Sequence, residues 1–157
     1  MKRNYLQAAV VSGLLCLSGA VFAETQDVFF DGDVSAACSF DGAAAEGTLD
    51  LRADGKQLSS EEGVGTRGEV VVTCTGAGTI GVMMPLGVTS VPAETAKASA
   101  LHATETGAAI AQSSGGPATI AGAVSAQKYY VSMGVDSSSL IPAGTYRYKV
   151  VVSVAAD

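Results

Sequence analysis

The sequence predicts an all-β fold of the sandwich or barrel type. Residues 129–135 and 146–154 alternate apolar with polar or charged side chains, which is the period of a half-buried strand. Glycine-rich stretches separate several shorter apolar segments, and nothing after residue 23 has a convincing helical period. Many short strands joined by glycine-rich turns are typical of β-sandwiches and β-barrels.

The first 23 residues have the organisation of a secretory signal peptide. A basic start is followed by an apolar run over residues 6–17, and Ala23 occupies the last position that a signal peptidase reads. We expect cleavage between Ala23 and Glu24, which leaves one mature domain of residues 24–157. The apolar run is shorter than the roughly 20 residues that span a membrane. The sequence therefore predicts Sec-dependent export to the periplasm, then the cell surface or medium, with no membrane span.

The charge of the mature chain is strongly negative. The whole chain has nine basic and fifteen acidic residues. Lys2 and Arg3 leave with the signal peptide, so seven basic residues remain and the net charge becomes −8. An acidic protein without a basic patch is poorly suited to nucleic acid or to an anionic membrane surface. We therefore expect neither as a partner.

Two cysteines remain in the mature chain after Cys16 is removed. An even number of cysteines in an exported protein indicates a disulfide bond. Cys74 shares a strand face with Val70 and Val72, and Cys38 lies on the apolar face of its own predicted strand. We predict a bond between Cys38 and Cys74 that stabilises the fold by about 4 kcal/mol in the chain-entropy picture.

The first predicted strand covers residues 28–41. Val28, Phe30 and Val34 fall on one face, and Asp31 and Asp33 fall on the other. The acidic face, together with Asp27, is interpreted as solvated rather than as a calcium site, because no loop motif with a closing glutamate is present.

The remaining elements are weaker, apart from the last two strands. Ile110 and Ile120 are expected to anchor two short strands around a turn at residues 113–117, within a stretch whose boundaries the sequence does not define. The other expected elements are a short strand at 48–52 with Leu49 and Leu51 inward, a loop at 53–68, strands at 69–75 and 78–86, an undefined stretch at 88–126, a strand at 129–135, a polar loop at 136–139, a turn at 142–144 and a last strand at 146–154.

The sequence contains little that points to catalysis. His102 is the only histidine, and we expect it at the surface. No nucleophile motif accompanies it, and no His/Cys cluster has metal-ligand spacing. We therefore predict a protein that is not an enzyme, with no catalytic residues, no cofactor and no metal ion.

Four segments together resemble the chaperone–usher pilins, and most closely the archaic branch with spore coat protein U-like domains. They are residues 28–40, 47–51, 70–74 and the turn at 142–146, which reads Pro-Ala-Gly-Thr-Tyr before the terminal strand. The first carries phenylalanine, glycine and valine on one face and ends near a cysteine, as in pilins. The resemblance covers both ends of the mature chain but not residues 88–126.

The resemblance implies an immunoglobulin-like, pilin-type β-sandwich that is incomplete and lacks one strand. It also implies a structural subunit of a surface fibre, or its tip, used in adhesion or biofilm. The implied partners are a periplasmic chaperone, an outer-membrane usher and neighbouring fibre subunits joined by donor-strand addition. The implied strand-acceptor edge carries Tyr146, Tyr148, Val150, Val152 and Val154.

One departure from pilins affects assembly. Only Glu24 to Asp27 precede Val28, and none is hydrophobic, whereas a donor extension needs about ten residues with alternating apolar side chains. We expect either a terminal subunit that accepts a strand without donating one or a domain that completes itself. A donor formed by residues 28–34 would remove the predicted first strand from its own domain.

Two alternatives to a fibre subunit remain open. One is a self-contained secreted β-sandwich that binds a surface polysaccharide or another ligand without polymerising. The other, a secreted hydrolase, is disfavoured by the single histidine.

Overall fold

The computed structural model describes residues 29–89 and 91–157, so the predicted signal peptide and its cleavage point at Ala23 and Glu24 lie outside the described residues. The described chain belongs to two units, Met1–Gly32 and Asp33–Asp157. The described part of the second unit holds twelve strands and no helix, and its strands pair antiparallel. The predicted all-β class is confirmed.

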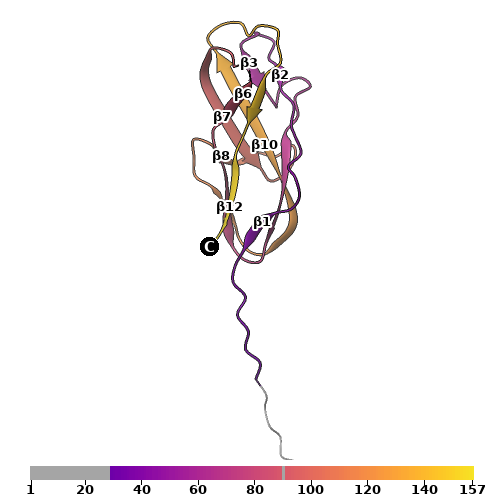
Figure 1. The fold of residues 1–157 in the computed structure, drawn as a ribbon, viewed down its shortest axis with the longest axis vertical. Helices are drawn as coiled ribbons and strands as arrows, with labels where there is room; N and C mark the ends of the chain where they lie inside the picture. The colour runs from indigo at the N-terminus through magenta and orange to yellow at the C-terminus, as the bar shows by residue number, and fades with distance from the viewer. Residues whose placement is uncertain (1–28, 90) are drawn as a thin grey trace, which may run out of the picture. The chain divides into compact units, whose positions relative to one another are not determined.

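Seven strands form the larger sheet, with β10 at its centre (Figure 1). β10 pairs with β4 and β3 along one edge and with β7 along the other; β1, β2 and β8 extend the sheet from β4, β3 and β7. These strands are β1 (Cys38–Phe40), β2 (Asp50–Leu51), β3 (Gln57–Ser59), β4 (Gly68–Cys74), β7 (Glu94–His102), β8 (Ala109–Gln112) and β10 (Val124–Ser137).

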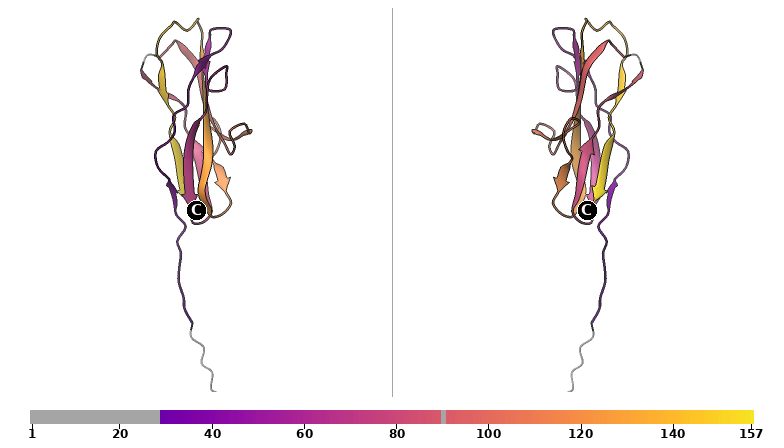
Figure 2. Two further views of the ribbon diagram at one scale, coloured as in Figure 1. Left: turned by 90° about the vertical axis from the view of Figure 1, so that its right-hand side faces the viewer. Right: turned by 90° about the vertical axis from the view of Figure 1, so that its left-hand side faces the viewer.

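The remaining strands form a second layer, seen edge-on in Figure 2. Three of them pair in the order β12–β5–β9, and the other two form the pair β11–β6. Their bounds are β5 (Gly78–Val82), β6 (Leu86–Thr89), β9 (Ala118–Ile120), β11 (Arg147–Lys149) and β12 (Val152–Ala156).

The hydrophobic core draws side chains from both layers. Val72 of β4 and Leu101 of β7 are fully buried, and Ile80 of β5 and Ile120 of β9 pack in the same cluster from the other layer. Each such side chain contributes roughly 1.5–3 kcal/mol by leaving water. A core shared by two layers of antiparallel strands is the packing of a β-sandwich.

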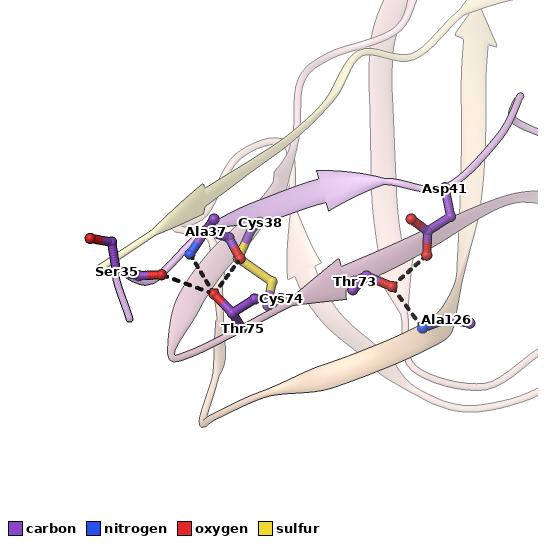
Figure 3. Close-up of a disulfide and its surroundings, with 8 residues drawn as sticks. All are labelled: Ser35, Ala37, Cys38, Asp41, Thr73, Cys74, Thr75 and Ala126. Atoms are coloured by element: carbon purple, nitrogen blue, oxygen red, sulfur yellow. Dashed lines mark hydrogen bonds between the residues drawn. A yellow bond between two sulfur atoms is a disulfide. The ribbon is translucent and has the colours of Figure 1, made fainter. Parts of the chain in front are cut away.

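The predicted disulfide is confirmed. Cys38 of β1 and Cys74 of β4 lie directly opposite each other, with 4.1 Å between their Cα atoms, and their sulfurs are bonded. Beside them, the amide of Ala37 donates to the Thr75 hydroxyl at 2.9 Å (Figure 3). The bond joins β1 to the end of β4, whose residues Val72 and Cys74 both belong to the core.

The prediction of a half-buried first strand at 28–41 is wrong for most of its length. Only Cys38–Phe40 forms a strand, and residues 29–37 form none. Phe30 is 92% exposed and Val34 is 86% exposed. The physical reason is the length of the neighbour. β4 ends at Cys74, directly opposite Cys38, and after the hydrogen bonds between Thr75 and Ala37 no strand pairs with the earlier residues.

Three further expectations need correction. The expected loop at 53–68 contains β3, whose Leu58 is buried between β10 and β2. The strand expected at 78–86 ends at Val82, and Leu86 begins the separate strand β6. The strand expected at 48–52 shrinks to two residues, and Leu51 is 44% exposed rather than inward.

The strongest patterns were predicted well. Tyr129 and Val135 of β10 are buried, as their alternation predicts. Ile110 and Ile120 lie in two short strands on either side of a turn, although β8 pairs with β7 and β9 with β5. The last predicted strand divides into β11 and β12, with the backbone between them still bonded to its neighbour through the Met83 amide and the Val151 carbonyl at 2.9 Å.

Candidate functional site

An open groove of about 800 Å³ runs beside the C-terminal strands. One wall is the segment of residues 44–49, and the other is formed by residues 145–150 with Val152. Val70 of β4 and Val131 and Met133 of β10 line it between the walls. We call this feature the groove.

The first wall is held to the larger sheet by backbone bonds. Ala45 exchanges two amide–carbonyl bonds with Glu69, at 2.9 and 3.0 Å, and Thr48 exchanges two with Thr66, each at 3.0 Å. Gly47 lies so close to this neighbour that an added Cβ would stand 2.5 Å from the Thr66 carbonyl oxygen. These contacts hold the wall tightly against residues 66–69, at the start of β4.

The second wall is formed by edge strands. β11 pairs only with β6, and β12 pairs only with β5, among the strands that the structure describes. β11 and the first residue of β12, Val152, line the groove. A strand edge without a ladder partner presents unpaired N–H and C=O groups, to which another strand can add.

The side chains of the second wall alternate in burial. Tyr146, Tyr148, Val150 and Val152 are half-buried and line the groove, whereas Val154 packs on the core farther along β12. Four of the five residues predicted for a strand-acceptor edge therefore border one groove. Their role as an acceptor stays a prediction.

The mouth of the groove carries charge. Arg147 and Lys149, two positions apart on β11, are exposed and line it. The Arg147 Nη2 lies 2.8 Å from the Glu46 Oε1, so this ion pair joins the two walls. Both side chains are exposed, at 64% and 83%, and an exposed pair of this kind contributes about 0–1 kcal/mol.

Two tyrosines shape the second wall. The Tyr146 hydroxyl donates to the Pro142 carbonyl at 2.6 Å and closes the turn that leads into β11. The Tyr148 hydroxyl is buried without a hydrogen-bond partner among the described residues. Burial, and next the neighbouring Glu94 carboxylate, raise the pKa of this phenol well above its usual range. Tyr148 is therefore held in its neutral form at the groove.

His102 lies at a different place from the one predicted. It is 4% exposed at the end of β7, and each ring nitrogen has a partner: the Gly107 carbonyl is 2.9 Å from Nδ1 and the Ser132 hydroxyl is 2.8 Å from Nε2. A carbonyl can only accept, so Nδ1 carries a proton and donates it to Gly107. The expectation of a surface histidine is wrong, because these two bonds satisfy a ring that the sequence pattern alone marks as polar.

A second cavity, of about 280 Å³, lies over the larger sheet. Its lining is mostly polar and includes Ser132, the partner of His102. The other polar side chains that line it are Gln57, Ser59, Glu61, Ser99, Gln112 and Ser114.

Neither a metal centre nor a membrane-spanning helix is present in the described part of the chain. Among its residues, no group of three or more His, Cys, Asp or Glu side chains is placed to hold a metal ion. No helix there is long and apolar enough to cross a membrane.

Comparison with known proteins does not assign a family. No protein-family model matches the chain, and no curated protein matches it significantly. Functional inference therefore depends on the groove and on the four segments that resemble pilins.

Proposed function

We propose that this protein is a structural subunit of a chaperone–usher-type surface fibre, a pilus or fimbria, or the tip of one, that serves adhesion or biofilm formation. The observation that carries the proposal is the groove beside the unpartnered edge of β11 and β12. An inserted strand can pair with this edge and direct alternate side chains onto Val70, Val131 and Met133. The sandwich would then be immunoglobulin-like and complete.

The proposed donor is the segment of residues 28–36 of another copy. Its alternation places Phe30, Gly32 and Val34 on one face, which suits an apolar groove. Residues 29–37 form no strand of their own. Donating residues 28–34 therefore removes no strand from the sandwich, and the hydrogen bonds of Ser35 and Ala37 with Thr75 lie beyond them. This finding replaces the expectation that only Glu24 to Asp27 are free to donate.

The proposed function also requires protein partners, because the groove is exposed to solvent before a strand enters it. An empty groove leaves an apolar surface and an open strand edge, a combination that favours aggregation. A periplasmic chaperone that lends a strand would protect it after export, and an outer-membrane usher would bring subunits together at the cell surface.

The experiment compares two adjacent phenylalanines. Phe30→Asp places a charge on the face that is proposed to enter the groove, and Phe29→Asp places it on the opposite face. Both side chains are more than 80% exposed, so neither change should affect folding. We expect sedimentation of the exported protein to show linear oligomers for wild type and Phe29→Asp, and monomers for Phe30→Asp.

The opposite result is also defined. A wild-type protein that is a soluble, cooperatively folding monomer at all concentrations, with no chaperone present, would contradict the fibre proposal. Equal oligomerisation of the two aspartate variants would contradict the proposed donor face.

The second cavity favours one alternative, a secreted sandwich that binds a surface polysaccharide. Hydroxyls and amides such as those of Ser59, Gln57 and Gln112 are suited to sugar hydroxyl groups. Titration of the monomer with oligosaccharides from the cell envelope tests this function. Saturable binding that Gln112→Ala weakens, in a protein that does not polymerise, would favour it over the fibre.

A further inference from the structure

The groove has a charge pattern at its mouth that the apolar part of the site does not require. Arg147 and Lys149 stand two positions apart on β11, so they project from the same face of the strand, about 7 Å apart. The nearest residues of that face, Thr145 and Val151, carry no charge. β11 therefore presents a single pair of neighbouring positive charges, with no other charge on the adjacent positions of that face.

The proposed donor segment has the complementary pattern. Asp31 and Asp33 also stand two positions apart, on the face opposite to Phe30 and Val34. Like Phe30 and Val34, both aspartates are exposed. A strand that directs its phenylalanine and valine into the groove must direct these two carboxylates outward, to the side on which β11 displays Arg147 and Lys149.

We propose that a second copy of this chain docks in the groove with Asp31 and Asp33 facing Arg147 and Lys149, and that this pairing sets the register of the inserted strand. The inference rests on the proposed function. For a given direction of the inserted strand, only one alignment places both carboxylates beside both cations. A shift of two residues leaves one cation without a partner and sets one aspartate beside Thr145 or Val151.

The existing contacts of Arg147 and Lys149 do not prevent the two cations from pairing with an inserted strand. Arg147 contacts Glu46 across the mouth of the groove, in an exposed pair that solvent already weakens. Lys149 makes no ion pair within the described residues. An inserted strand would therefore replace one weak contact with two cross-strand pairs.

The test is a charge swap in the full chain. One variant reverses the donor charges, Asp31→Lys with Asp33→Lys, and a second reverses the acceptor charges, Arg147→Glu with Lys149→Glu. A third combines all four changes. We expect each half to weaken association about tenfold or more, from the loss of two cross-strand charge pairs, and the combination to recover to within about threefold of wild type.

Charge swapping is preferred to a salt titration. The mature chain is acidic overall, so salt screens the long-range repulsion between subunits as well as the proposed attraction. Arg52→Glu with Lys56→Glu is the matched control, because it changes the net charge as the acceptor variant does at two exposed positions that do not line the groove. This control should associate at least fivefold more tightly than the acceptor variant.

The outcomes separate the inference from the proposed function. If Phe30→Asp abolishes association and the four-fold swap fails to restore it, the charge register is wrong and the fibre proposal stands. The same holds if the control weakens association as much as the acceptor variant does. If Phe30→Asp has no effect, residues 28–36 do not dock in the groove, and the donor segment and the charge register are overturned together. A wild type that stays monomeric overturns the fibre proposal itself.

Discussion

Residues 29–37 and residues 146–154 carry similar patterns and have opposite outcomes. Both alternate apolar with polar or charged side chains. The later segment pairs with β5 and β6 and packs on the core, whereas the earlier one forms no strand, with Phe30 and Val34 almost fully exposed. Alternation of apolar and polar side chains therefore indicates that a segment can form a strand. Whether it does so depends on the presence of a neighbouring strand.

The contrast also shows what each region lacks. The early segment has strand character without a ladder partner among the described residues, and the edge of β11 and β12 has an adjoining groove without a strand in it. The charges of the two regions are opposite as well. Association between copies would give the early segment a strand to pair with, and it would place a strand in the groove.

The largest expected effect is at the boundary between the exposed segment and the sandwich. Cys38 begins β1, and Cys38→Ser with Cys74→Ser opens a loop of 36 residues. We expect the free energy of unfolding to fall by about 4 kcal/mol, measured by urea titration. Ser39→Ala, on the exposed side of the same strand, should leave it unchanged. A loss below about 1 kcal/mol would show that packing alone holds β1.

The next effect compares the two segments directly. Val150→Asp places a charge on a half-buried wall residue packed against the core, and we expect a loss of about 2–4 kcal/mol. Val34→Asp should change the unfolding free energy of the monomer by less than about 0.5 kcal/mol, because this side chain is exposed. Similar losses in urea titrations of the two would mean that residue 34 belongs to the sandwich.

A smaller effect appears at alkaline pH. Because the pKa of the Tyr148 phenol is raised in the folded domain, the unfolded chain loses this proton first, near pH 10. The stability of the wild-type protein should therefore fall as the pH rises above 10. The stability of the Tyr148→Phe variant should fall less steeply. Melting temperatures between pH 8 and 11 measure the difference. Parallel curves for the two proteins would contradict a buried neutral phenol at the groove.

The smallest effect concerns the pair across the groove. Glu46→Gln should change monomer stability by less than about 1 kcal/mol, because both partners are exposed. It also frees Arg147 for an incoming carboxylate, so sedimentation should show association that equals or slightly exceeds that of wild type. A clear weakening of association would show that Glu46 supports docking instead of competing with it.

The sequence predicted the strands whose buried positions are apolar. β4 follows this rule, since Val72 and Cys74 are buried, and β10 follows it in part, since Tyr129 and Val135 are buried together with Ser132 and Ser137. The disulfide followed from the predicted export signal and from the inward position of Cys74. The last strand was recognised for the same reason, through the alternation of Tyr148 and Val150.

The strand β7 was not predictable in this way. Two of its three buried positions are polar. Ser99 donates to the Met83 carbonyl at 2.7 Å, and His102 is held by Ser132 and Gly107. Hydrogen bonds from distant segments satisfy these groups, and hydropathy patterns do not register them. The groove was hidden for a related reason, because its walls come from residues about 100 positions apart.

The most direct test is amide hydrogen exchange across residues 29–36 as a function of protein concentration. The account predicts exchange at the rate of an unstructured peptide in dilute monomer. On assembly, these amides should become protected together with those of residues 146–154. Protection in the dilute monomer, or continued fast exchange in the assembled protein, would contradict insertion of this segment into the groove of another copy.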